Sequence, residues 1–203
     1  RDYYASRGLG DVYKRQPEYR GKKSVLICND KIVEVSDKKE YNLENLKVID
    51  GNGKKLVPGI IDQHIHITGG GGEGSFKTRV PEVALSSLIK GGVTTVVGLL
   101  GTDSTTRCVE NLVAKAKGLK EEGINCYCLT GAYAYPTPNI TGSIKRDITF
   151  INEIIGVKIA YSDHRSSAIT VDELAKIVAE ARVGGMLSGK AGYVTMHMGC
   201  LLY

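Results

Sequence analysis

Between residues 58 and 199, apolar segments of strand length alternate with helix-like segments, and this alternation restricts the possible folds more than any other feature of the sequence. The strand-like segments are Gly59–Ile67, Val93–Leu100, Ile124–Gly131, Gly156–Ser162 and Gly192–Gly199. Helices are predicted between them over Pro81–Lys90, Thr105–Glu122, Lys145–Ile155 and Val171–Val183, with a capping-box signature, Thr170 and Glu173, at the last. Strands that are apolar along most of their length and are separated by helices are typical of a parallel sheet covered by helices.

Polar side chains decide whether such a sheet is doubly wound or a barrel. They recur at or just past the carboxyl ends of all five strands: His64 and His66, Thr102 and Asp103, Tyr133, Lys158 and Asp163, and His197. A (β/α)8 barrel builds its site from the carboxyl ends of its strands in this way. We therefore predict an α/β fold, in which residues 58–199 form the first five β/α units of an eight-stranded TIM barrel.

The segment before the barrel lacks the alternation of strands and helices and contains only short strand-like runs. Residues 17–57 are predicted to form part of a small β-sandwich, with strands at Ser24–Cys28 and Lys31–Ser36 joined by a turn at Asn29–Asp30, and two more short strands within residues 47–59. Residues 1–16 resemble translated sequencing-adapter read-through, and residues 200–203 resemble the start of the same artefact. We expect both ends to be non-native and the natural protein to continue further.

Composition excludes several classes of protein. The formal charge of +5 is modest and spread along the chain, which does not favour nucleic-acid binding, and no apolar run reaches the length of a membrane span. The five cysteines form no Cys-x-x-Cys motif, which indicates a reducing compartment and predicts a cytoplasmic protein. Cys126 and Cys128 share one strand face and are predicted to be buried core thiols rather than metal ligands.

Two histidines at the end of the first barrel strand indicate metal binding. His64 and His66 are two residues apart, so their side chains project from the same face of a strand. The glycine-rich segment that follows, with Glu73 at its centre, would allow a ligand to approach closely. A His-x-His pair alone more often marks half-buried histidines at a strand edge than a metal site, because short motifs have many false positives.

Lys158 is the most informative single residue. It interrupts an apolar strand, where an unpaired ammonium is costly to bury. Such a lysine needs a carboxylate partner, for which Asp62 is a candidate, or a lowered pKa, or a covalent change that suits the site.

The combination of "PGIIDQHIHI", the mid-strand Lys158 and the strand-end His197 resembles the amidohydrolase superfamily of metal-dependent hydrolases. The longer segments "DQHIHITGGGGEG", "GVKIAYSDHRSS" and "ARVGGMLSGKAG" are similar to the β-aspartyl (isoaspartyl) dipeptidase family, and the resemblance extends over residues 17–199. It implies zinc-dependent hydrolysis of dipeptides with an N-terminal β-linked aspartate, in a protein that forms homo-oligomers at full length.

The resemblance also implies roles for individual residues. His64 and His66 would bind one zinc, His197 a second, and N6-carboxylated Lys158 would bridge both, with a metal-bridging hydroxide as the nucleophile. Tyr133 would stabilise the oxyanion, Glu73 would bind the substrate's α-ammonium, and Arg165 a substrate carboxylate, with Gly71 and Thr102 completing the pocket. Asp163 and His164 are expected to be loop residues that orient these groups.

The family pattern includes a further metal-binding histidine and a catalytic aspartate, which the resemblance places beyond Tyr203. We therefore expect the 203-residue chain to be a truncated, inactive and poorly folded fragment. Two other interpretations remain: an amidohydrolase that opens cyclic amides, as dihydroorotase and hydantoinase do, and a barrel scaffold without catalysis. Glu73 disfavours the first, because a neutral ring offers no ammonium for it to bind.

Overall fold

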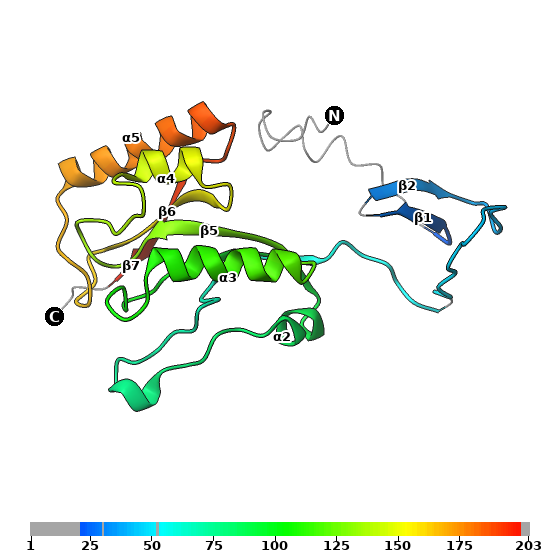
Figure 1. Cartoon of the computed structure of the whole chain (residues 1–203), viewed down its shortest axis with the longest axis horizontal. Helices are drawn as coiled ribbons and strands as arrows, with labels where there is room; N and C mark the ends of the chain where they lie inside the picture. Colours follow the sequence, from blue (N-terminus) through cyan, green and yellow to red (C-terminus); the bar gives the residue numbers. More distant parts are fainter. Residues whose placement is uncertain (1–20, 30, 52, 200–203) are drawn as a thin grey trace. The chain divides into compact units, whose positions relative to one another are not determined.

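A computed structural model of the chain describes residues 21–29, 31–51 and 53–199. The segments predicted to be artefacts, 1–16 and 200–203, lie outside these residues. The chain divides into two compact units at residues 56 and 57, and each is described separately (Figure 1). Helices of the described residues are all too short or too polar to cross a membrane.

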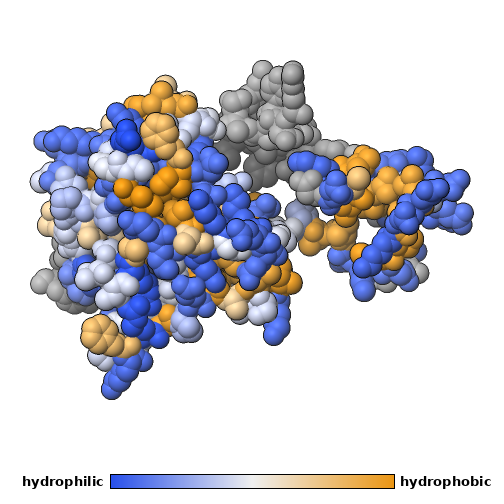
Figure 2. All heavy atoms as spheres, viewed as in Figure 1, coloured by the Kyte–Doolittle hydropathy of each residue, from blue (hydrophilic) through white to orange (hydrophobic). Residues whose placement is uncertain are grey.

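The first unit contains one antiparallel hairpin. Strands β1 (Ser24–Cys28) and β2 (Lys31–Ser36) are the two strands that the sequence predicted, and they pair with Ser24 opposite Ser36 and Cys28 opposite Lys31. The two additional strands predicted within residues 47–59 are wrong, because residues 47–51 and 53–59 contain no strand. The apolar side chains there have no strand partner to cover them: Val48 and Ile49 are 78% and 82% exposed. Figure 2 shows hydrophobic residues at the surface of this unit.

The second unit is a curled parallel sheet of five strands, which confirms the predicted part of a TIM barrel. Its strands are β3 (Ile60–Ile65), β4 (Val93–Gly98), β5 (Asn125–Gly131), β6 (Ile154–Tyr161) and β7 (Tyr193–Met198), and they pair in sequence order. All four neighbouring pairs that this order creates are parallel, so every strand ends at the same edge of the sheet.

Helices connect the strands, and several begin or end at different residues from those predicted. They are the 3-10 turn η1 (Phe76–Thr78), α2 (Leu85–Lys90), α3 (Val109–Glu121), α4 (Ile144–Phe150) and α5 (Val171–Ser188). Helix α2 does not begin at Pro81, because the Val83 amide donates to Ile67 O at 3.1 Å and keeps the preceding backbone extended. Helix α4 ends at Phe150 because Ile154 already belongs to β6. The predicted capping box of Thr170 and Glu173 is present in α5.

The hydrophobic core lies mainly between the sheet and the helices that cover it. Leu112 of α3, Cys126 and Cys128 of β5, Ile148 of α4 and Ile177 of α5 are at most 4% exposed in this cluster. Figure 1 shows α3 lying along β5, and α4 and α5 packed side by side. A smaller cluster, made by Val97, Leu99 and Leu129 with Tyr193, packs separately from the first. The two thiols are buried, as predicted, and burial raises the pKa of Cys126 to about 11.

Truncation of a core leucine tests this packing. Leu112→Ala removes a side chain that is 0% exposed, and we expect it to lower the free energy of unfolding by about 2–5 kcal/mol. Leu187→Ala is the matched control, because Leu187 is also helical but 68% exposed, and it should change stability by less than about 0.5 kcal/mol. Urea unfolding followed by circular dichroism measures both values, and equal losses would contradict the described core.

Candidate metal centre

The four predicted metal ligands lie at the carboxyl ends of three strands. His64 is in β3 and His66 directly follows it, with their rings 5.8 Å apart and nearly perpendicular. Lys158 lies in β6 and His197 in the neighbouring β7, where Ala160 is the register partner of His197. Burial lowers the pKa of His64, and the nearby charges of Lys158, His66 and His197 lower it further. The fold therefore places Lys158, His66 and His197 within electrostatic reach of His64.

Hydrogen bonding leaves one ring nitrogen of His66 available to a metal. Its Nδ1 lies 3.0 Å from Leu99 O. A carbonyl oxygen only accepts, so Nδ1 carries the hydrogen and donates it. In the neutral ring the lone pair is then on Nε2. Fixing one nitrogen by a backbone carbonyl is how proteins orient a metal-binding histidine.

Asp163 plays the same part for His197. Its Oδ2 lies 2.9 Å from His197 Nε2, and its side chain is only 3% exposed. A carboxylate accepts at neutral pH, so Nε2 donates and the neutral ring presents Nδ1. His164, which was expected to act similarly, is 77% exposed and lies 3.6 Å from the same carboxylate. Only Asp163 of the two is therefore placed to orient a predicted ligand.

Lys158 is the residue that the fold leaves unsatisfied. It is 0% exposed, and its Nζ has no hydrogen-bond partner among the described residues. Burial lowers its pKa to about 8. The predicted alternative, a pairing with Asp62, is not made: Asp62 Oδ1 instead accepts from the His64 amide at 3.0 Å. A buried amine without a partner is a group for which a ligand or a covalent change would compensate.

Histidines, cysteines and carboxylates do not by themselves complete a metal site in the part of the chain that the structure describes. Within residues 21–29, 31–51 and 53–199, no group of three or more such side chains is arranged to hold an ion. Lys158 is thus essential to the predicted centre, because it would join the His64–His66 pair to His197.

Tyr133 lies among the predicted metal and substrate residues. It follows β5 and is 8% exposed. Its ring centroid is 5.0 Å from that of His197 and 5.5 Å from both Lys158 Nζ and Arg165 Cζ. Burial raises the pKa of its hydroxyl, so this group remains protonated and able to donate a hydrogen bond at neutral pH.

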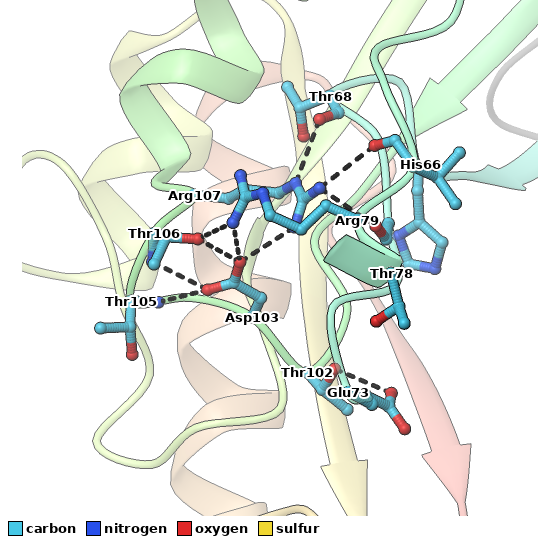
Figure 3. Close-up of polar contacts among 12 residues, drawn as sticks. His66, Thr68, Glu73, Thr78, Arg79, Thr102, Asp103, Thr105, Thr106 and Arg107 are labelled. Carbon is cyan, nitrogen blue, oxygen red and sulfur yellow. Dashed lines mark hydrogen bonds and ion pairs between the residues drawn. The ribbon is translucent and has the colours of Figure 1, made fainter. Parts of the chain in front are cut away.

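The predicted substrate-binding charges contact each other. Arg165 Nη1 lies 3.2 Å from both carboxylate oxygens of Glu73. The Thr102 hydroxyl donates to Glu73 Oε1 at 3.0 Å (Figure 3). Hydrogen bonds from Arg165 and Thr102 lower the pKa of Glu73. Asp163 holds the other side of Arg165, accepting from its backbone amide, Nε and Nη2 at 2.8–3.0 Å. The contact between Arg165 and Glu73 connects residues that are 92 positions apart in the sequence.

A cavity of about 270 Å³ lies beside this ion pair. Gly71, Glu73 and Thr102, three of the predicted substrate residues, contribute to its wall. Gly71 has a φ of 66°, and a Cβ there would lie 2.6 Å from Thr78 O. Only glycine therefore fits the close backbone approach at this position.

Two residues near the cavity were missed as functional candidates. Asp103 stood out at a strand end but received no role, and Arg107, which lies within the helix predicted over residues 105–122, was not singled out. In the structure Arg107 is 6% exposed and its Nη1 donates to Asp103 Oδ2 at 2.9 Å. The sequence signal for Asp103 was its position after β4, whereas nothing local marked Arg107 as buried.

Comparison with known proteins decides the family. Residues 56–188 match the profile of the amidohydrolase family, which covers more than half of the chain. The chain belongs to the amidohydrolase family. It is also similar to the crystal structure of a β-aspartyl dipeptidase from Fervidobacterium islandicum AW-1, with a TM-score of 0.85 and 54% identity over 90% of this chain and 50% of that chain.

A second crystal structure from the same organism contains the dipeptidase in complex with β-Asp-Leu. Its TM-score is 0.84, with 55% identity over 91% of this chain and 49% of that chain. Dihydroorotase from Bacillus cereus is 32% identical over 98 residues, which are 48% of this chain and 22% of that protein. This amidohydrolase chain thus spans about half the length of the solved dipeptidases.

The Asp103 interactions predict a dependence of stability on pH. Burial alone would raise the pKa of Asp103, but hydrogen bonds from Thr106 and Thr105 and the charge of Arg107 lower it to about 2 from 3.8. The unfolded state therefore binds the proton first, and the stabilisation present above about pH 4 is lost as pH falls toward 2. Asp103→Asn should lower the free energy of unfolding at pH 6 by about 1–3 kcal/mol.

The same comparison at pH 3 should show a smaller difference between wild type and variant. Urea unfolding at both pH values measures it. A difference that stays constant between pH 6 and pH 3 would show that Asp103 does not have the lowered pKa.

Proposed function

We propose that this amidohydrolase hydrolyses β-aspartyl dipeptides at a two-zinc centre formed at the carboxyl ends of β3, β6 and β7. The observation that supports a metal centre most directly is the buried amine of Lys158, which has no hydrogen-bond partner among the described residues and lies close enough to His64 to lower the pKa of that imidazole. The substrate class is supported by similarity to dipeptidases, one of which was solved with β-Asp-Leu.

The residues present suit zinc. His64 and His66 would hold one ion and His197 a second, with neutral imidazole nitrogens as ligands. Addition of carbon dioxide to the neutral Lys158 amine releases one proton and forms a carbamate, whose two oxygens could contact both ions. This reaction replaces an uncompensated amine by an anionic ligand, which accounts for its burial. When bound, the zinc pair supplies a hydroxide nucleophile near neutral pH and polarises the amide carbonyl.

The surrounding side chains would bind and orient the dipeptide. Glu73 accepts hydrogen bonds from the α-ammonium, and Arg165 donates two to a substrate carboxylate. Because these residues form an ion pair with each other in the structure, a zwitterionic substrate would exchange its own charges for theirs. The Gly71 segment and Thr102 line the adjacent cavity.

Tyr133 would act on the reacting carbonyl. Its hydroxyl is protonated at neutral pH, and the centroid of its ring lies 5.0 Å from that of His197 and 5.5 Å from both Lys158 Nζ and Arg165 Cζ. A hydrogen bond from this group to the carbonyl oxygen would stabilise the negative charge that develops as the amide carbon becomes tetrahedral.

The remaining features of the proposal concern the whole protein. Two zinc ions need more ligands than these four side chains, so we propose that further ligands come from outside the described residues and that the 203-residue chain alone is inactive. We also propose a cytoplasmic homo-oligomer.

A substrate panel tests the activity. The natural open reading frame that contains residues 17–199 should be expressed and loaded with zinc. We expect kcat/KM to be far higher for β-Asp-Leu than for α-Asp-Leu or dihydroorotate. A preference for dihydroorotate would support the cyclic-amide alternative, which the Bacillus similarity favours. Zinc content near zero together with no turnover would support a scaffold without catalysis.

Replacement of Lys158 tests the metal centre independently of turnover. Lys158→Ala should abolish retention of zinc after gel filtration, because the group predicted to join the two histidine sites is lost. Incubation of wild type with ¹³C-bicarbonate should give a carbamate ¹³C resonance that the variant lacks. Lys117→Ala, at an exposed position of α3, should retain both signals. Equal zinc content in the two variants would contradict the proposed centre.

A further inference from the structure

The loop that carries Glu73 is closed at its base by backbone hydrogen bonds. Val80 N donates to Gly70 O at 2.8 Å, and Gly72 N donates to Thr78 O at 3.2 Å. Gly71 and Arg79 form an isolated antiparallel bridge between these two bonds. Residues 70–80 therefore form a narrow hairpin-like loop, and Glu73 lies at its distal end.

Arg107 contacts both arms of the loop at its base. Its Nε donates to Thr68 O at 3.2 Å, and its Nη2 donates to Gly70 O at 3.0 Å and Val80 O at 3.2 Å. Figure 3 shows the guanidinium lying between these carbonyl groups and Asp103. Gly70 and Val80 are the two residues whose mutual hydrogen bond closes the base, so a single side chain bonds to both arms.

Asp103 neutralises Arg107 and connects it to the next strand. It accepts from Arg107 Nη1 at 2.9 Å and from Arg79 Nη1, on the returning arm of the loop, at 3.1 Å. Backbone amides of Thr105 and Thr106 fix its other oxygen. Arg107 and Asp103 thus fix the base of the loop. Thr102, which directly precedes Asp103 in the chain, contacts Glu73 at the distal end of the same loop.

The arrangement requires arginine specifically. A buried cation must be compensated on all sides, and here three carbonyls and one carboxylate surround it. The planar guanidinium directs its donors to these separate acceptors, whereas the ammonium of lysine is a compact point charge that cannot reach all of them.

We propose that Arg107 is a positioning residue for substrate recognition: with Asp103 as its counterion, it fixes the base of the 70–80 loop so that Glu73 is held in place for the substrate's ammonium. The substrate part of this inference rests on the function proposed above for Glu73. Arg107 itself would touch neither substrate nor metal and would act through the loop.

Hydrogen exchange tests whether Arg107 holds the loop. In Arg107→Met, amides of residues 70–80 should exchange about tenfold faster or more, while amides of α5 keep their wild-type rates. Arg107→Lys keeps the charge and should give an intermediate increase, which maintains the test if the methionine variant fails to fold. Arg182→Met, at an exposed position of α5, is the matched control and should leave the loop unchanged. Unchanged exchange in both Arg107 variants would overturn the proposal.

Binding tests whether the loop position matters for recognition. The kcat and KM of the zinc-loaded protein for β-Asp-Leu are measured by steady-state kinetics, and KM is the readout of binding. We expect Arg107→Met and Glu73→Gln each to weaken binding about tenfold. Because Arg107 acts through Glu73, the double variant should bind no more weakly than Glu73→Gln alone. A purely structural effect would instead add to that of Glu73→Gln, and such additivity would overturn the positioning role.

The two experiments separate the possible failures. A wild-type protein that does not bind β-Asp-Leu overturns the proposed substrate and with it the recognition role. Exchange then still decides whether Arg107 fixes the loop. Normal binding with unchanged exchange in the Arg107 variants leaves the proposed function intact and overturns only the inference about Arg107.

Discussion

Burial of the Lys158 amine within β6 is the constraint on which the site depends. The side chain is completely enclosed by the parallel sheet, and none of the described residues offers it a hydrogen bond. A sheet that encloses such a group without compensation would sacrifice stability, since an unpaired buried charge is costly. The neighbouring imidazoles do not relieve this cost, because none of them accepts a hydrogen bond from the amine. The arrangement becomes reasonable when the amine is converted to an anion that shares cations with those imidazoles, as proposed.

Among the predicted substrate-binding residues, by contrast, each ionised side chain has a partner of opposite charge. Asp163 connects His197 to Arg165, and Arg165 connects Asp163 to Glu73. The orientation of a predicted metal ligand and that of the predicted substrate charges are therefore linked through one buried carboxylate. Arg107 and Asp103 form a second set of interactions, which fixes the backbone of the glycine-rich loop rather than a ligand. The glycines permit close approach, and the buried arginine limits the freedom that they would otherwise give to the loop.

Much of the fold could be predicted because its signals are local and periodic. The five parallel strands and the capped start of α5 follow from apolar runs and from the pairing of Thr170 with Glu173. The predicted secondary structure was wrong where the local conformational preference of a segment did not decide its structure, because contacts with distant residues did. Pro81 suits a helical first turn, but hydrogen bonding of Val83 to the end of β3 delays α2 until Leu85. Val48 and Ile49 have strand-like side chains, yet no described strand pairs with them. Strand formation needs a partner, and a single segment does not reveal whether one is present.

The sequence by itself determined the order of strands and helices, the end of the sheet at which the polar groups gather, and the membership of Lys158 in an apolar strand. These follow from residue type and spacing, because parallel strands must all end at one edge. Only the tertiary structure decided that Glu73 and Arg165 pair with each other, that Asp163 rather than His164 orients His197, and that Arg107 is buried against three carbonyls. Each of these contacts joins residues from different loops or depends on how one side chain turns, and local sequence specifies neither.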